Sequence, residues 1–296
     1  MSHEAAPLPS APSVPAGDLR PALPRHLSAV LTGLGLGLVL AGALLWGRPL
    51  NAQVFLVINA WGPAAPLLWS MLSLAGLGGA VWIHVGATSW GRPRRVAALL
   101  WVIVVGGALV HLLKHRLATP RPLGVLGADQ VHVIGQALNT QSMPSGHSAM
   151  GLALAVLMLV DGGLGTPRAR LQAALWGLLG LGIALSRPAV GAHWPSDVLF
   201  GGGLGVLAAL IAGRAWGVNA LARRIDSVAG RRVMAAVFVV SGLVFAFTRT
   251  ENPSAHLLQV ALGALGVYGA RRWWHSAGVK AREQAATQAA AAGPDA

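Results

Sequence analysis

The sequence predicts an all-α, polytopic integral membrane helix bundle with a six-span core and about two additional C-terminal spans. Of the 296 residues, 54% are hydrophobic and only 10% are charged, whereas soluble globular domains carry about 25% charged residues. Apolar runs of about 20 residues recur along the chain, which is the length that a helix needs to cross a bilayer. The chain has no cysteine, which excludes a disulfide scaffold, a thiolate metal site and a cysteine nucleophile.

The expected elements follow from these runs in order. Residues 1–26 are rich in Pro and Ala and are expected to form a disordered tail. The run 27–46 is longer than a signal-peptide core, so we expect an uncleaved first span. The stretch 50–64 contains Pro and Asn and is expected to be an outer loop or an interfacial segment. The other expected spans are 66–89, 96–114, 147–161, 170–186, 197–213, 232–249 and 254–270.

These elements divide the chain into five parts. Residues 27–213 form the six-span core, and the basic stretch 214–231 is expected to be a cytoplasmic linker along the membrane surface. Residues 232–270 are expected to add two transmembrane helices, followed by a basic and then Ala-rich C-terminal tail over 271–296. Within the core, Gly201 and Gly205 have the spacing of small residues at a close helix–helix contact.

The basic residues predict the orientation of the bundle. With a cytoplasmic N-terminus, 16 of the 22 Lys and Arg residues lie in inner segments and 6 on the outer side, as the positive-inside rule prefers. Both termini are then cytoplasmic. The net charge of +13 is distributed over short clusters between apolar runs, where basic residues contact lipid headgroups. Because no aromatic and basic platform interrupts these runs, nucleic acid is not an expected partner.

Three segments on the expected outer side contain most of the unusual polar residues. The first segment, 114–122, closes the third span. The second, 144–147, opens the fourth span, and the third, 186–197, connects the fifth span to the sixth. The predicted topology places all three on one membrane face, so we expect their side chains to form one site.

The cations of these segments predict a phosphate site. Lys114, Arg121 and Arg187 have no matching carboxylates in the sequence around them, and unpaired cations near a membrane are costly unless an anion completes the site. The planar fork of Arg suits phosphate oxygens. The fourth span begins at Ser145 and Gly146, where unpaired backbone N–H groups favour an anion and glycine permits its close approach.

Two histidines and an aspartate predict the chemistry. His193 and Asp197 are four residues apart and share a helix face if the sixth span begins between them. Asp197 can then fix the tautomer of His193 and leave the other ring nitrogen free as a nucleophile. His147 is a second titratable group for the leaving oxygen. Phosphoryl transfer through a phosphohistidine is favoured over a single zinc ion on these three residues, because the neighbouring cations oppose a metal.

The motifs together resemble the type 2 phosphatidic acid phosphatase family, membrane lipid phosphate phosphatases related to vanadium haloperoxidases. The family pattern is K-x6-R-P, P-S-G-H and S-R-x5-H-x3-D, and all its defined positions are present here: Lys114, Arg121, Pro122, Pro144, Ser145, Gly146, His147, Ser186, Arg187, His193 and Asp197. The resemblance implies that His193 is the nucleophile, that Asp197 orients it and that His147 protonates the leaving lipid oxygen. It also implies that no metal or other cofactor takes part, and that the phosphate oxygens are held by Lys114, Arg121, Ser145, Gly146 and Arg187.

We therefore expect a multi-pass lipid phosphatase with an extracytoplasmic active site, whose partners are the bilayer and a membrane lipid phosphate. The expected substrate is undecaprenyl diphosphate or a phosphatidate-like phospholipid. The 20 Arg against 2 Lys suggest a GC-rich bacterial genome, and hence the inner (cytoplasmic) membrane. A lipid-linked phosphotransferase would use the same site. A phosphate or anion transporter is disfavoured because the polar residues lie at span ends and not at the midplane. The sequence does not predict the oligomeric state or a role for the two additional spans.

Overall fold

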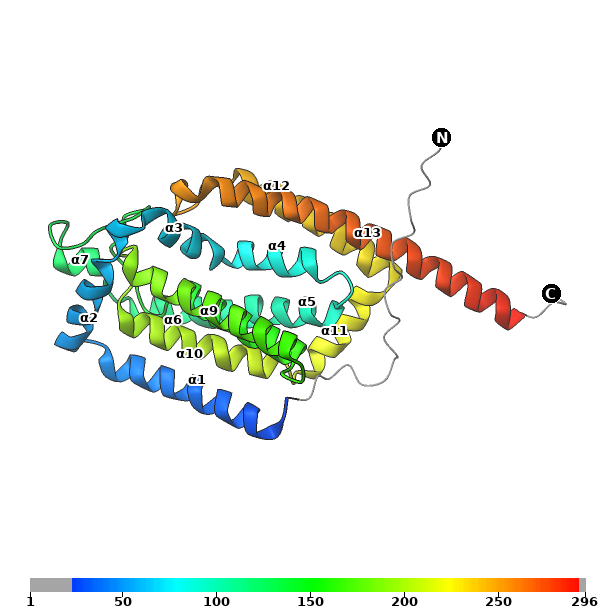
Figure 1. Ribbon diagram of the computed structural model, residues 1–296, viewed down its shortest axis with the longest axis horizontal. Helices are drawn as coiled ribbons and strands as arrows, with labels where there is room; N and C mark the ends of the chain where they lie inside the picture. Colours follow the sequence, from blue (N-terminus) through cyan, green and yellow to red (C-terminus); the bar gives the residue numbers. More distant parts are fainter. Residues whose placement is uncertain (1–22, 293–296) are drawn as a thin grey trace.

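The structure, a computed structural model, describes residues 23–292, and all regular secondary structure in this range is helical (Figure 1). The all-α fold class predicted from the sequence is confirmed. Of the expected N-terminal tail, residues 1–22 lie outside the described range. Arg25 already begins the first helix, α1 (Arg25–Leu45).

The segment between the first two expected spans is helical and sharply bent. Residues that we expected to form an outer loop or interfacial segment form α2 (Pro49–Asn59) and the short helix η1 (Gly62–Ala64). The chain then turns by 111° into α3 (Pro66–Ala75). A break after Ala75 separates α3 from α4 (Gly78–Thr88), so the expected single span 66–89 is two helices. Gly76 lies at this break, and glycine weakens a helix because its backbone loses the most freedom on folding.

The middle of the chain follows the expected spans closely. The helix α5 (Pro93–Trp101) continues through a π-helical turn, η2 (Val102–Gly106), into α6 (Gly107–Leu117). After a short α7 (Pro122–Leu126) come α8 (Gly146–Gly162), α9 (Pro167–Ala189) and α10 (Pro195–Ala212). Local sequence fixes where these helices begin. Ser145 and Thr166 cap α8 and α9 by accepting a backbone N–H, and proline opens α9 and α10, where its missing N–H costs nothing.

The C-terminal part differs from the expectation at its end. The basic stretch 214–231 contains α11 (Trp216–Asp226) and the start of α12 (Val228–Phe247). After η3 (Pro253–Ala255), a single helix, α13 (His256–Ala292), continues for 37 residues and extends past the end of the bundle (Figure 1). The expected basic and Ala-rich tail over 271–296 is thus helical up to Ala292. The Ala, Gln, Glu, Lys and Arg residues of this stretch are all strong helix formers, which explains the continuation.

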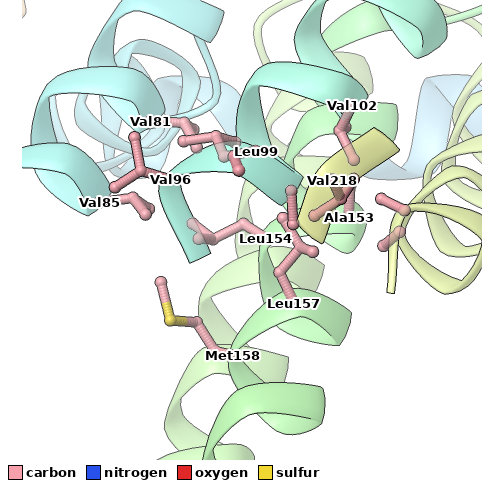
Figure 2. Close-up of a cluster of buried hydrophobic side chains, with 14 of the residues drawn as sticks. Val81, Val85, Val96, Leu99, Val102, Ala153, Leu154, Leu157, Met158 and Val218 are labelled. Atoms are coloured by element: carbon pink, nitrogen blue, oxygen red, sulfur yellow. The ribbon is translucent and has the colours of Figure 1, made fainter. Parts of the chain in front are cut away.

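The helices pack side by side around α10 and α8. The central helix α10 lies against α1 and α8, α8 lies against α9, and the α12–α13 hairpin covers α4. A buried core joins α4, α5, α8 and α11, and Figure 2 shows the side chains that meet there: Val81, Val85, Val96, Leu99, Val102, Ala153, Leu154, Leu157, Met158 and Val218. Gly201 and Gly205 of α10 lie against backbone atoms of Ser145 and Ala149, which is the close packing that their spacing indicated.

Several helices are apolar and long enough to cross a membrane. Among the residues that the structure describes, five segments meet this criterion by length and composition, with the bent α2–α3 pair as a sixth candidate: Arg25–Leu45, Pro93–Leu126, Pro167–Ala189, Pro195–Ala212 and Val228–Phe247. The shorter apolar helix α8 packs against α9 and α10 within the bundle. Large apolar side chains remain exposed along α1, α9 and α12, such as Leu36, Leu178 and Val240, and an apolar surface of this kind suits contact with lipid.

The two ends of the bundle differ in character. At one end, Asp161 accepts from Arg92 and Arg95, and Asp226 accepts from Arg231 and Lys280. At the other end, α2, α3 and α7 gather around the loop that precedes α8 (Figure 1). The three motif segments lie at this second end.

Candidate active site

The structure brings the three motif segments together at the end of the bundle where α2, α3 and α7 gather. The guanidinium of Arg121 connects two of them, since its Nε donates to the carbonyl of Thr140 at 2.8 Å and its Nη1 to that of Ala192 at 3.0 Å. The backbone N–H of Ser145 donates to the carbonyl of Asp197 at 3.0 Å. The three segments, which contain all eight candidate residues, therefore meet at one end of the bundle.

His193 and Asp197 form the centre of the cluster. His193 lies in the loop between α9 and α10, and Asp197 lies in the first turn of α10. Nδ1 of His193 is 3.4 Å from Oδ2 of Asp197, a long hydrogen-bond contact, and both side chains are buried. This contact leaves Nε2 as the ring nitrogen that does not face the carboxylate.

Burial and charge set the protonation state of His193. Burial, followed by the positive charges of Arg121 and Lys114, lowers the pKa of His193 well below its usual range, because each of these factors disfavours an imidazolium. The imidazole is therefore neutral at pH 7. A neutral ring with one nitrogen directed at a carboxylate has its other nitrogen lone pair available for attack.

Asp197 is positioned by a serine that the sequence analysis missed. The hydroxyl of Ser142 donates to Oδ2 of Asp197 at 2.5 Å, and the backbone N–H of Trp194 donates to the same oxygen at 2.9 Å. Both the serine and the aspartate are fully buried. Hydrogen bonds to a carboxylate are stronger than neutral ones, so these two donors fix the oxygen that faces His193. Ser142 lies two residues before the P-S-G-H motif, and no spacing rule in the sequence distinguishes it.

Lys114 projects from the last turn of α6 toward the loop before α8. Its Nζ donates to the backbone carbonyls of Gln141 and Ser142 at 2.6 Å and 3.1 Å. No ion pair within residues 23–292 involves Lys114 or Arg121, and both are held instead by backbone carbonyls. The carboxylates of Asp197 and Glu251 act on both cations from a distance without forming an ion pair with either, so both cations remain able to attract an anion.

The first residues of α8 add further polar groups to the candidate site. Ser145 is the N-cap, and its Oγ accepts from the N–H and the hydroxyl of Ser148. Gly146 opens the helix, and a Cβ there would meet Val110 at an ordinary 3.7 Å, so packing within the protein does not require glycine. His147 follows, and its buried Nε2 has no hydrogen-bond partner among the residues described. A buried polar atom of this kind calls for a partner, and a bound substrate can supply it.

Arg187 departs from the expectation that all three cations lack carboxylates. It is 1% exposed, and its Nη2 is 3.1 Å from Oε2 of Glu251, in the loop between α12 and α13. Its Nη1 donates to the hydroxyl of Ser73 in α3. Its Nε is buried without a partner in the described part of the chain. The additional hairpin, in which the sequence showed no comparable polar cluster, therefore reaches the candidate site.

Two buried asparagines of α2 hold the surrounding segments in place. The amide of Asn51 donates to Oγ of Ser196 at 2.9 Å and accepts from its N–H at 3.0 Å, which fixes the start of α10. Asn59 bonds to both the N–H and the carbonyl of His132 and to the carbonyls of Pro188 and Ala189. The Pro and Asn content that suggested a broken loop in the sequence thus belongs to a helix that supports the site.

The residues described offer no ready metal site. No group of three or more His, Asp or Glu side chains within residues 23–292 is arranged to hold a metal ion. The cluster instead combines one neutral histidine, a second histidine with a free ring nitrogen, and three cations. This set is suited to binding an oxyanion and transferring it to nitrogen.

Comparison with known proteins shows that the part of the chain with this cluster is similar to a known family. Residues 95–220 match the model of the PAP2 superfamily, and this stretch contains all eight candidate residues. The crystal structure of LpxE from Aquifex aeolicus is similar to this chain, with 26% identity and a TM-score of 0.50 over 57% of this chain and 98% of that one. No match is found among curated proteins. The α12–α13 hairpin lies beyond the residues that match the PAP2 model.

Proposed function

Because residues 95–220 form a PAP2 superfamily domain, we propose that the chain is an integral membrane lipid phosphatase that works through a phosphohistidine on His193. The observation that carries this proposal is the position of a neutral, buried His193 between Asp197 and three cations. The substrate is a lipid phosphate or diphosphate, either undecaprenyl diphosphate or a phosphatidate-like phospholipid.

The proposed reaction has two steps. In the first, His147 acts as an imidazolium, the form that the negative charge of the bound phosphate favours. Nε2 of His193 attacks phosphorus, the N–P bond forms, and the bond from phosphorus to the leaving oxygen breaks as the imidazolium gives that oxygen a proton. In the second, His147 takes a proton from water, the water oxygen attacks phosphorus, and the N–P bond breaks to release inorganic phosphate. A diphosphate substrate leaves a lipid monophosphate after the first step. Asp197 stabilises the positive imidazole ring of the intermediate.

The remaining candidate residues bind the transferred group. Lys114, Arg121 and Arg187 supply positive charge, and Ser145 and Gly146 bring the first N–H groups of α8 toward the phosphate oxygens. In phosphoryl transfer, charge spreads over the equatorial oxygens in the transition state. Fixed cations and N–H groups therefore stabilise the transition state more than water does, because they need no reorientation.

We propose that the site faces the extracytoplasmic side of a bacterial inner membrane, with both termini in the cytoplasm. The clustering of Arg92, Arg95, Arg231 and Lys280 at the opposite end of the bundle supports this orientation. The chain has no cysteine, so single cysteines introduced at the exposed positions Asp129 and Gly165 test it directly. A membrane-impermeant maleimide should label only the first in intact cells, and labelling of only the second would reverse the orientation.

Phosphate release by the purified chain tests the activity. The substrates are undecaprenyl diphosphate, phosphatidic acid, phosphatidylglycerol phosphate and lipid A, each with and without EDTA. His193→Ala should abolish release. His132→Ala, which removes an exposed ring and keeps the backbone bonds to Asn59, is the matched control and should keep it.

The possible outcomes separate the alternatives. Release that survives EDTA supports the proposed route, whereas release that requires added Mg²⁺ would indicate a metal mechanism. If the folded protein releases phosphate from none of these lipids, lipid hydrolysis is contradicted. Transfer to an acceptor would then have to be tested with the same variants.

A further inference from the structure

The loop between α12 and α13, residues 248–255, is fixed against the candidate site. The carbonyl of Glu251 accepts from the N–H of Gln136 at 2.9 Å. A Cβ on the neighbouring Gly135, whose φ is +89°, would lie 2.1 Å from that carbonyl oxygen, so only glycine allows this approach. On the other side of the loop, the hydroxyl of Ser254 donates to that of Ser70 in α3 at 2.8 Å.

This anchoring directs one carboxylate at the site. Oε2 of Glu251 lies 3.1 Å from Nη2 of Arg187, and the Glu251 side chain is 32% exposed while Arg187 is 1% exposed. Because Nη1 of Arg187 also donates to the hydroxyl of Ser73, two of the three guanidinium nitrogens are hydrogen-bonded. The third, Nε, is buried and has no partner in the described range. A phosphate that binds Arg187 must therefore approach a guanidinium that already carries a carboxylate.

Positive charges outnumber negative charges around the candidate site, so the Glu251–Arg187 ion pair changes its charge balance. Lys114, Arg121 and Arg187 contribute three positive charges, and the two carboxylates are Asp197 and Glu251. Asp197 is engaged by Ser142, by the N–H of Trp194 and by His193. Glu251 is thus the carboxylate that offsets Arg187, and it comes from a hairpin outside the PAP2 match at residues 95–220.

We propose that Glu251 is a specificity-determining counter-ion that limits the affinity of the site for phosphate anions. Two anions on one guanidinium repel each other, and the repulsion grows with the charge of the phosphate group. The hairpin would thereby weaken the binding of the inorganic phosphate that the reaction yields and assist its release. This inference rests on the proposed function, because it takes Arg187 as a phosphate ligand.

The magnitude follows from Coulomb's law. We take one charge on the Glu251 carboxylate and one on the bound phosphate, about 5 Å apart in a partly exposed site with an effective dielectric constant of about 40 to 50. Their repulsion then weakens the binding of phosphate by about tenfold. Glu251→Gln removes the charge but keeps an oxygen that can accept from Arg187, so the position of the guanidinium is preserved. Asp129→Asn is the matched control, because Asp129 is an exposed acid in the loop 127–145 and its replacement removes the same charge.

The experiment measures binding of inorganic phosphate to the purified full chain by calorimetry, and its inhibition of lipid hydrolysis. Glu251→Gln should tighten phosphate binding about tenfold and lower KM without raising kcat, while Asp129→Asn leaves both unchanged. Glu251→Ala, a second variant in case the first does not fold, should also tighten binding.

The contradicting results are distinct from a failure of the proposed function. Unchanged or weaker phosphate binding in folded Glu251→Gln would overturn the inference, as would equal tightening in Asp129→Asn. Phosphate binding that is undetectable in every variant would overturn it too. The calorimetric comparison does not depend on turnover. A chain that binds phosphate as expected but hydrolyses no lipid would refute the phosphatase activity and leave the role of Glu251 supported.

Discussion

Ser142→Ala isolates the hydrogen bond that orients the Asp197 carboxylate. The hydroxyl donates to Oδ2 at 2.5 Å, and this is the oxygen that faces Nδ1 of His193. A hydrogen bond to a charged group contributes about 1.5–3 kcal/mol. If about 2 kcal/mol is lost in the transition state, the rate falls about thirtyfold, because each 1.36 kcal/mol corresponds to a factor of ten. KM should change little, since alanine keeps the backbone carbonyl that Lys114 uses.

The assay compares kcat and KM of Ser142→Ala with those of Ser186→Ala. Ser186 is a matched control because it is equally buried and its hydroxyl donates to the carbonyl of Ile183 within its own helix. Its loss should affect folding stability more than turnover. A kcat within twofold of wild type for Ser142→Ala would refute the view that this serine orients the catalytic aspartate.

Two further predictions concern pH and packing. The pKa of His193 is lowered by burial and by the nearby cations, so the ring stays neutral below its ordinary value of about 6.5. The acid limb of the pH profile of kcat/KM, corrected for substrate ionisation, should therefore have its midpoint below pH 6.5. In Arg121→Ala this midpoint should move to higher pH, because one of the cations that lower the pKa of His193 is removed. A wild-type midpoint above pH 6.5 would contradict the prediction. For packing, a Cβ on Gly205 would lie 1.9 Å from the carbonyl oxygen of Ala149, whereas Gly37 has open space. Gly205→Ala should thus destabilise the bundle by about 2 kcal/mol or more and lower its Tm in detergent. Gly37→Ala is the control and should leave the Tm unchanged. An equal Tm for the two variants would contradict the prediction, because it would show that the helices move apart at no cost.

The sequence predicted the membrane bundle and the convergence of the three motif segments because both depend on simple rules. Apolar run length gives the spans, and alternating crossings place the ends of the third and fifth spans on one face. His193 and Asp197 could be paired from their spacing of four. These relationships are local or topological, so they can be derived without knowing any tertiary contact.

The contacts that the sequence did not predict join residues far apart in the chain. Asn51 and Ser196 are 145 positions apart, and Arg187 and Ser73 are 114 positions apart. No pattern in either partner's neighbourhood indicates the other. The same holds for Glu251, which is one of nine acids in the sequence and is distinguished only by the packing of α12 and α13 against α4.

Helix ends show a similar limit. The break after α3 and the continuation of α13 to Ala292 both reflect local helix propensity acting where the hydropathy pattern says little. A hydropathy profile shows where the apolar segments lie and how long they are, but it does not distinguish a kinked helix from a straight one. It also assigns an alanine-rich polar stretch to a tail, although alanine favours a helix.

The most direct test of the account is detection of the covalent intermediate. The purified chain is mixed with a lipid substrate labelled with ³²P in its terminal phosphate, quenched within milliseconds, and examined for protein-bound label that is stable in alkali and lost in acid, as phosphohistidine is. The account predicts such label on His193 in the wild-type chain and none in folded His193→Ala. Turnover with no trapped label at any time, or label that persists in His193→Ala, would contradict nucleophilic attack by this histidine.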